Sequence, residues 1–340
     1  MCMPPAPDRV QARSTTSGQT RETSIPEARV PSSFKPKRVV VAINPSASFG
    51  ATRAVGPAVV QTLRAMGHDV TSLQEPDYES LLSTARAAVK TKPDAFVVVG
   101  GDGMVNLGTN LVAGTKVPLG IVPSGTGNDM ARSLGLPFDN TEAAVVALGE
   151  ALQHPARIID AARITYTDDE GEAAERWFAC ALSAGFDATV NERANLMHHP
   201  KGPSRYIIAL GIELAKLKPY HYTLTLDGIE QTVDANMVSI GNGVSLGGGM
   251  KITPDALLDD GLLDVMIVRP LSRINFVRIF PSVFKGEHVK HPKVSVVRAK
   301  DVRIAGEGVV VYGDGERVGR APVDVKLVPG ALRVLAPHPA

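Results

Sequence analysis

The order of apolar runs, loops and helical stretches between residues 37 and 133 constrains the fold more than any other feature of the chain. β-Branched runs predict buried strands in RVVVAINP after Lys37, at Asp69–Leu73, in AFVVVG from Ala95 and at Pro118–Val122. We predict helices at Thr52–Met66, at Tyr78–Val89, near Val105–Ala113 and from about Met130. Strands that alternate with helices predict a parallel, doubly wound sheet, in which ligands bind where the strands end in loops.

From about residue 158 the chain is richer in strand-like runs, which predict antiparallel strands and hairpins. Helical stretches near 204–218 and 272–285 interrupt these runs. The expected fold class is therefore an α/β, doubly wound parallel-sheet domain followed by a second, β-rich and sandwich-like domain. The predicted divisions are a tail at 1–36, the α/β domain at 37–157, the β-rich domain at 158–322 and a C-terminal segment at 323–340. Whether the last strand, Val323–Leu335, returns to the first domain is left open.

The bulk composition is that of a globular chain of two domains, with 340 residues, 44% apolar and 21% charged. The polar tail predicts disorder, and an organelle-targeting peptide is the alternative. Two distant cysteines, Cys2 and Cys180, argue against a disulfide framework and favour a reducing cytosol. No apolar run approaches the ~20 residues needed to cross a bilayer. We therefore expect a cytoplasmic protein.

The strongest local motif runs from Val97 to Asn106, VVVGGDGMVN, where a strand ends in glycines. Gly100 and Gly101 let the backbone approach a phosphate, with amides turned towards it. Asp102 supplies a carboxylate where a magnesium–nucleotide would need one. A strand that simply ends in a glycine turn is the alternative. No Lys-Ser/Thr pair follows the glycines, so the motif is not a P-loop.

Two further loops leave strands in the same manner. In Pro123–Asp129, PSGTGND, glycines free the backbone and Thr126 offers a hydroxyl to a phosphate, while Asn128 and Asp129 also suit helix capping. The loop Asn44–Gly50, NPSASFG, follows the first strand. Because three such loops converge at one edge of a doubly wound sheet, they predict a phosphate-binding site.

Two acidic turns occur in the β-rich half. The segment from Ala256 to Asp264, ALLDDGLLD, offers a carboxylate and main-chain oxygens to a hard cation, although Asp-Gly between apolar runs favours a plain hairpin turn. Gly313-Asp314-Gly315-Glu316 projects Glu316 beside a glycine, which suits a general base that must reach an incoming hydroxyl. Taken alone, this motif is a hairpin tip.

The order of these loops, with LGGGMKITPDA after Val244, resembles the diacylglycerol kinase catalytic family, and most of all its bacterial lipid kinase branch. The resemblance covers about residues 37 to 336. It implies an ATP-dependent kinase that converts diacylglycerol to phosphatidic acid, with ATP between an α/β domain and a β-rich domain. It also implies Mg²⁺ with the ATP and a second, structural Mg²⁺.

The resemblance assigns roles to individual residues. Glu316 matches the proton acceptor and Asp102 is the second catalytic candidate. The structural ion is matched by Asp260 with the carbonyls of Leu257 and Leu262. The residues expected to contact ATP are Asn44, Pro45, Ser46, Gly100, Gly101, Asp102, Gly103, Met104, Val105, Asn106, Gly125, Thr126, Gly127 and Asn128.

The chain departs from the family pattern at three places. Met104 stands where the family usually has Thr, which removes a hydroxyl and puts a side-chain role there in doubt. Ser48 stands where glycine is common. A threonine that contacts the nucleotide at the end of the second strand has no clear counterpart, and Thr71 or Ser72 is the nearest candidate.

The partners follow from the same reasoning. Ser204–Lys218 and Asn275–Lys293 are apolar with basic residues, so each is either a core-packing helix or a segment that rests peripherally on an anionic membrane surface. Nucleic-acid binding has little support because the basic segments lack interleaved aromatics. A sphingoid or ceramide kinase, an NAD kinase and a nucleotide-binding regulator without catalysis are the competing functions. A homodimer stays open.

Overall fold

The computed structural model describes residues 34–45, 55–197, 199 and 203–338. The described residues from Lys35 onward belong to one compact unit. The tail predicted at 1–36, Ser46 and most of the first predicted loop lie outside the described residues, except for residues 34–36 of the tail.

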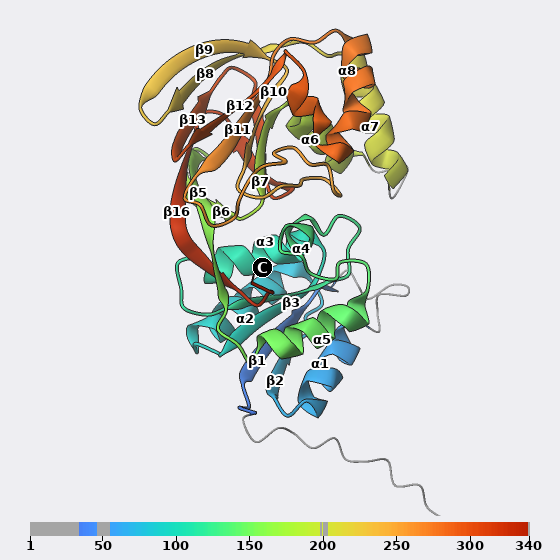
Figure 1. The fold of residues 1–340 in the computed structure, drawn as a ribbon, viewed down its shortest axis with the longest axis vertical. Coiled ribbons are helices and arrows are strands. Elements are labelled where there is room, and N and C mark those ends of the chain that lie inside the picture. Colours follow the sequence, from blue (N-terminus) through green and yellow to red (C-terminus); the bar gives the residue numbers. More distant parts are fainter. Residues whose placement is uncertain (1–33, 46–54, 198, 200–202, 339–340) are drawn as a thin grey trace, which may run out of the picture. The chain divides into compact units, whose positions relative to one another are not determined.

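A parallel sheet forms the first part of the chain (Figure 1). Its elements are β1 (Arg38–Ile43), α1 (Val55–Ala65), β2 (Asp69–Leu73), α2 (Tyr78–Lys90), β3 (Ala95–Gly100), α3 (Asp102–Val112), β4 (Leu119–Pro123), α4 (Asp129–Ser133) and α5 (Thr141–Ala151). The strand order is β2-β1-β3-β4, and these neighbours all pair in parallel.

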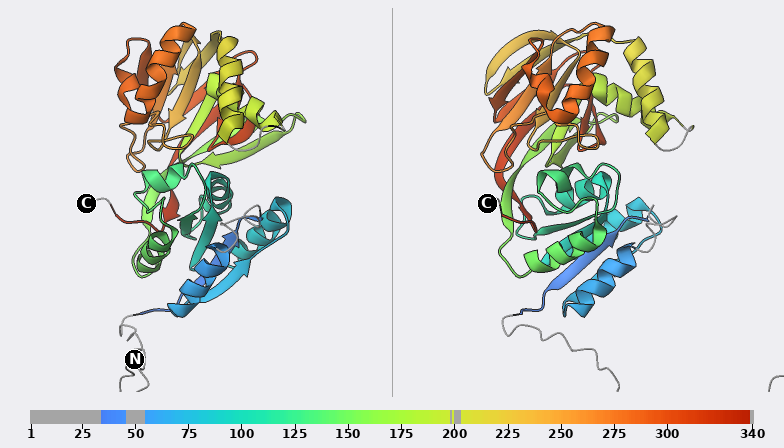
Figure 2. Two further views of the ribbon diagram at one scale, coloured as in Figure 1. Left: turned by 90° about the vertical axis from the view of Figure 1, so that its right-hand side faces the viewer. Right: turned by 45° about the vertical axis from the view of Figure 1, so that its right-hand side comes forward.

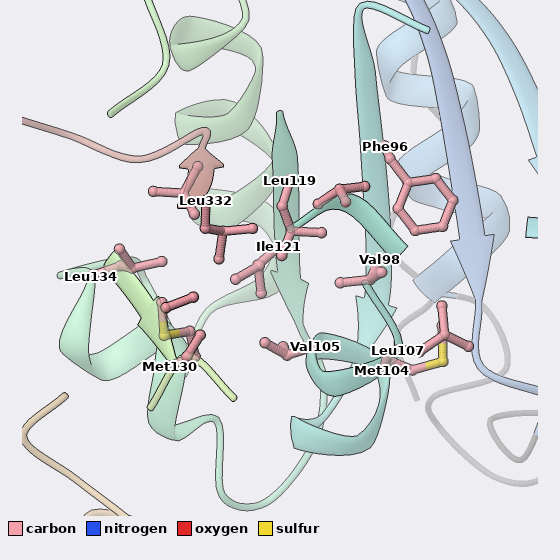
Figure 3. Packing of buried hydrophobic residues seen from close by; sticks show 14 of the residues in the cluster. Phe96, Val98, Met104, Val105, Leu107, Leu119, Ile121, Met130, Leu134 and Leu332 are labelled. Carbon is pink, nitrogen blue, oxygen red and sulfur yellow. The ribbon is translucent and has the colours of Figure 1, made fainter. Parts of the chain in front are cut away.

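Helices cover both faces of this sheet, because successive side chains of a strand point to opposite faces. Phe96 and Val98 of β3 belong to one buried cluster with Leu107 of α3, as Figure 3 shows. Val97 and Val99 belong to another cluster, formed with residues of α1 and α5. All six residues of β3 are buried, as expected for a central parallel strand.

The second part of the chain adds antiparallel strands and three helices. Its elements are β5 (Arg157–Thr167), β6 (Ala173–Phe178), β7 (Ala181–Gly185), α6 (Phe186–Leu196), α7 (Pro203–Ala215), β8 (Tyr220–Leu226), β9 (Ile229–Ala235), β10 (Met237–Gly241), β11 (Leu263–Val268), α8 (Arg273–Ile279), two 3₁₀ helices (Phe280–Lys285 and Glu287–Lys290), β12 (Val294–Ala299), β13 (Asp301–Ala305), β14 (Val310–Gly313), β15 (Glu316–Arg320) and β16 (Val323–Val334).

These strands form two layers around an apolar core. One layer continues the parallel sheet in the order β4-β16-β13-β8-β9, with β5 beside β16 and β6 beside β5, and the other has the order β12-β11-β10-β7-β14-β15. Ile164 and Leu224 from the first layer and Leu182 and Val238 from the second lie in one buried cluster. The doubly wound sheet with a β-sandwich was therefore predicted correctly.

Strand β16 connects the two parts of the chain. It pairs antiparallel with β5 and β13, and Val334 near its end pairs in parallel with Leu119 of β4. Figures 1 and 2 show β5 and β16 running side by side into the parallel sheet. Leu332 lies in the same buried cluster as Leu119 (Figure 3).

Three local features differ from the sequence expectations. Helices α5 and α6 were not predicted. The run RWFACALSAG is not continuous, because β6 and β7 belong to different layers and a bend at residues 179–180 separates them. The stretch 272–285 begins as α8 and continues from Phe280 as a 3₁₀ helix, which has Pro281 in its first turn.

Candidate active site

The two glycine loops meet through their backbones at the carboxyl ends of β3 and β4. Ser124 N donates to Gly100 O at 2.9 Å, and a Cβ atom added to Gly125 would lie 2.5 Å from the Cα of Gly101. Any side chain at Gly125 would therefore push the loops apart. Asn44 N donates to Val99 O at 3.2 Å, so the start of the first loop lies beside them.

The Asp102 carboxylate fastens one glycine loop to the other. It accepts hydrogen bonds from Asn128 N at 3.0 Å and from Asp129 N at 2.8 Å, the backbone donors at the start of α4. Burial and then the charge of Asp129 raise the pKa of Asp102. Its oxygens retain lone pairs for a further ligand, since each accepts one of these bonds.

Thr126 and Asn128 take different positions in the second loop. Thr126 is exposed, and its hydroxyl has no hydrogen bond within the described part of the chain. Asn128 is buried, accepts from Gly125 N at 3.1 Å and donates to Gly125 O at 2.9 Å and Phe138 O at 3.1 Å. Thr126 thus presents a free hydroxyl, whereas the Asn128 side chain holds the loop's shape.

The side chains that follow the first glycines point into the interior. Met104, Val105 and Asn106 are 3%, 4% and 4% exposed. Met104 packs in the cluster of Figure 3, and a Cβ atom on Gly100 would lie 2.4 Å from Met104 Cγ. A phosphate above the start of α3 would therefore meet backbone N–H groups. The thiomethyl group of Met104 fills space in the core.

Glu316 stands over this same helix start. Gly313 and Glu316 pair across the β14–β15 hairpin, whose two turn residues, Asp314 and Gly315, have φ of 46° and 82°. A Cβ atom added to Gly103 would lie 3.2 Å from Glu316 Oε1. Glu316 is exposed and has no hydrogen bond or ion pair with the described residues. The structure brings Glu316 to the glycine loop.

Asp314 braces the hairpin that carries Glu316. Its buried carboxylate accepts hydrogen bonds from Ala179 N at 2.8 Å, Cys180 N at 3.0 Å and Ala181 N at 2.9 Å. Burial raises its pKa to about 6, against the lowering effect of these three donors. The same bonds fix the bend between β6 and β7. Sequence reasoning assigned no role to Asp314.

Tyr78, at the start of α2, interacts electrostatically with Glu316. Burial raises the pKa of Tyr78, the charge of Glu316 raises it further, and Arg176 lowers it. Arg176 donates to Arg317 O at 2.8 Å. Tyr78 therefore senses the charge of Glu316, and neither Tyr78 nor Arg176 was singled out from the sequence.

Asp129 links the first part of the chain to the glycine run 247–249. Its carboxylate accepts from Gly248 N at 2.9 Å and from Gly249 N at 2.8 Å. Gly248 and Gly249 have φ of 85° and 94°, so both amides converge on one carboxylate in a conformation that suits glycine. Sequence reasoning saw only helix capping in Asp129, because its partners lie about 120 residues away.

The acidic turn before β11 is held by its own partners. Asp260 accepts from Leu262 N at 3.1 Å and pairs with Arg298, whose Nε lies 3.8 Å from Asp264 Oδ1. The buried Asp264 Oδ2 has no partner, and burial, then Asp255, raise the pKa of Asp264. Leu257 is exposed. No group of three or more acidic, His or Cys side chains that would hold a metal occurs within the described ranges.

A cavity of about 720 Å³ begins at this site and extends under α6, α7 and α8. At its polar end lie Asp102, Thr126 and Asp314. Most of its other lining is apolar and includes Phe186, Leu210, Met237, Met266, Phe276 and Phe280. The glycine loops, with the exposed Glu316 carboxylate beside them, therefore lie where a largely apolar cavity opens.

Comparisons with known proteins agree with this geometry. Residues 38–163 match the family described as the diacylglycerol kinase catalytic domain, and residues 180–336 match the YegS C-terminal NAD kinase beta sandwich-like domain. A diacylglycerol kinase of Mycobacterium tuberculosis is 40% identical over 302 residues, which cover 88% of this chain and 96% of that protein. One of Staphylococcus epidermidis is 27% identical over 305 residues, 88% of this chain and 92% of that protein.

Solved structures show the same fold. A diacylglycerol kinase from Bacillus anthracis matches with a TM-score of 0.65 at 22% identity, covering 89% of this chain and 98% of the other. An NAD kinase from Archaeoglobus fulgidus in complex with ATP matches with a TM-score of 0.50 at 13% identity, covering 88% and 93%. Among the described residues, no helix is both long and apolar enough to traverse a bilayer.

Proposed function

The chain belongs to the bacterial branch of the diacylglycerol kinase family, and on that premise we propose that it transfers the γ-phosphate of ATP to the hydroxyl of diacylglycerol, giving phosphatidic acid. One observation carries the proposal: the exposed Glu316, unpaired among the described residues, stands within reach of Gly103 and follows Gly315, which lines the polar end of an apolar cavity. A lipid whose chain lies in that cavity presents its hydroxyl between the carboxylate and the glycine loops.

The geometry suits phosphoryl transfer by positioning. The backbone N–H groups at the start of α3 and the Thr126 hydroxyl hold the phosphates of ATP, with Gly100–Asn106, Gly125–Asn128, Asn44 and Pro45 around them. Glu316 accepts the proton of the lipid hydroxyl while that oxygen bonds to the γ-phosphorus. The bond from the γ-phosphorus to the bridging oxygen breaks, and ADP leaves with the electron pair.

Mg²⁺ is the expected partner of the nucleotide. When bound, it would neutralise charge on the β- and γ-phosphates, and Asp102 is the carboxylate placed to hold it through its free lone pairs. The donor set fits, since Mg²⁺ usually takes one or two carboxylates, phosphate oxygens and water. A second, structural ion would bind Asp260 with the carbonyls of Leu257 and Leu262. The observation that supports an ion in this turn is the buried Asp264 Oδ2, which has no hydrogen-bond partner among the described residues.

A peripheral position on an anionic membrane completes the proposal. Half of the large apolar side chains that are exposed in the described structure lie on α6, α7, α8 and the 3₁₀ helix after α8: Leu196, Ile207, Ile208, Ile212, Ile274, Val277 and Phe284. We call this set the apolar face. Exposed basic residues flank it, namely Lys216, Lys218, Arg273, Arg278 and Lys285. Apolar and basic side chains on neighbouring helices favour an anionic lipid surface.

A kinase of sphingoid lipids or ceramide is the second candidate. The observation that favours it equally is the cavity, because an apolar lining accepts any lipid chain and does not distinguish an ester from an amide. In this proposal the glycine loops contact ATP, so they do not indicate which lipid is phosphorylated.

In the test, the purified protein is incubated with labelled ATP and with a mixed lipid extract, a sphingoid base, ceramide and NAD. The labelled products are then separated. Labelled phosphatidic acid as the main product supports the proposal. A labelled sphingoid or ceramide phosphate in its place would assign the second candidate. Labelled NADP without labelled lipid would reject lipid phosphorylation altogether.

A further inference from the structure

The cavity under α6, α7 and α8 has a floor formed by a β-sheet and a roof formed by helices. Its floor is the outer face of the second layer, where Met237 of β10 and Met266 and Val268 of β11 lie. Their neighbours along the strands, such as Val238 and Val265, point to the sandwich core on the other face. The roof is a cluster that joins the three helices through residues such as Phe186, Leu210 and Phe276.

The size of this cavity suits one alkyl chain. One water molecule occupies about 30 Å³ in the liquid, so a cavity of about 720 Å³ accommodates roughly 24 groups of that size. A methylene group is of similar size. This is room for one acyl chain of membrane length and too little for two.

The two ends of the cavity meet different surroundings. At one end lie Asp102, Thr126 and Gly315, beside the glycine loops and Glu316. Elsewhere the lining includes Ile207 of α7, which is 67% exposed and also belongs to the apolar face. A lipid that leaves a membrane at α7 therefore passes from one apolar surface to another without crossing water.

We propose that this cavity is a binding site for a single acyl chain of the substrate lipid, entered from the apolar face, while the second chain stays outside it. The inference rests on the proposed function for the identity of the lipid. Each methylene group that the cavity buries strengthens binding, so the affinity for the lipid depends on the length of one chain.

The experiment fills the cavity with a larger side chain. Met237→Trp narrows it from the floor, and Leu210→Trp narrows it from the roof in case the first variant fails to fold. Ile229→Trp is the matched control, because Ile229 on β9 is 75% exposed and is not part of the cavity lining. Circular dichroism and thermal unfolding establish that each variant is folded.

Two readouts are taken. The first is the binding of a fluorescent polyene fatty acid, whose chain reports an apolar site without any phosphoryl transfer. We expect one molecule per chain, and at least tenfold weaker binding in Met237→Trp or Leu210→Trp but not in Ile229→Trp. Unchanged binding in the folded cavity variants, or two molecules per chain in the wild type, would overturn the inference.

The second readout is the ratio of kcat/KM for a dipalmitoyl over a dihexanoyl diacylglycerol in mixed micelles. We expect this ratio to fall at least tenfold in the cavity variants and to stay within twofold in the control. An equal fall for both substrates contradicts the acyl site. Probe binding that follows the expectation, together with no phosphorylation of any diacylglycerol by the wild type, would reject the proposed substrate and leave the chain-binding site in place.

Discussion

Glu316 differs from the other acidic side chains around it in burial and in partners. Asp102, Asp129 and Asp314 are each held by two or three backbone N–H groups, whereas Glu316 is exposed and unpaired among the described residues. A carboxylate that must accept a proton from a substrate needs a free oxygen in the site. The other three carboxylates instead fix the loops around it.

Replacing Glu316 with Gln tests its role as the base. The variant keeps the size of the side chain but cannot accept the proton, so we expect kcat to fall by a factor on the order of 10²–10⁴. The affinity for ATP, measured by nucleotide titration, should change little. Near-normal turnover with intact ATP binding would remove Glu316 from the mechanism.

Asp187 is a titratable group whose effect belongs to stability. It lines the cavity, its Oδ1 is buried without a partner, and burial raises its pKa to about 6 from an ordinary value of 3.8. Between pH 4 and 6 the folded state therefore holds a proton that the unfolded state has lost. Folding stability falls as pH rises through this interval, and the penalty is complete above it.

The Asp187→Asn variant removes this dependence. We expect the two proteins to be equally stable near pH 4. At pH 7 the variant should be more stable by about 3 kcal/mol, because the pKa of Asp187 differs by about two units between the folded and unfolded states. Urea unfolding at pH 4, 5, 6 and 7 measures it. A stability difference that stays constant across these pH values would show that Asp187 titrates normally.

The site residues found from the sequence are those that local pattern alone specifies. Gly100, Gly101 and Glu316 occur in motifs of strand, glycine and turn, and the structure brings their loops together. Whether they bind ATP or move a proton stays a prediction. Asp129 and Asp314 were not recognised, since their partners are 119 to 135 residues away and no local period encodes such contacts.

At the scale of elements, the bounds of β2 at Asp69–Leu73 were predicted correctly, and α2 begins at Tyr78 as expected. Both carry strong periodic patterns between polar caps. Helix α6 was missed because its apolar stripe is weak and charged residues interrupt it. The break between β6 and β7 depends on Asp314, which follows it by more than 130 residues.

The link between α4 and the glycine run 247–249 makes an element-scale prediction. Asp129→Ala leaves the N–H groups of Gly248 and Gly249 without their charged acceptor, and each such bond is worth about 1.5–3 kcal/mol. We expect a loss of about 3–6 kcal/mol, for the two bonds together, in the free energy of unfolding by urea. Asp129→Asn retains one acceptor oxygen and should lose about half as much. An alanine variant within 0.5 kcal/mol of the wild type would show that the link is dispensable.

At the scale of the whole molecule, the proposed membrane binding depends on the apolar face. Ile207→Asp with Ile274→Asp places charges on α7 and α8 where both side chains are exposed, so folding should be unaffected. We expect co-sedimentation with vesicles of anionic and neutral lipid to fall at least fivefold. The control is Ile229→Asp, on a distant hairpin of comparable exposure. Wild-type binding that does not depend on anionic lipid content would count against the membrane proposal.

The last strand of the chain completes the first sheet. Leu335 N donates to Leu119 O at 2.8 Å and Val334 pairs with Leu119, so among the described residues the edge of β4 away from β3 is covered by residues near the C-terminus. During synthesis on the ribosome, the part of the chain that forms the parallel sheet is therefore complete in sequence long before it is complete in structure. Until some 200 further residues have been translated, this edge exposes unpaired backbone groups of the kind that can pair with another chain.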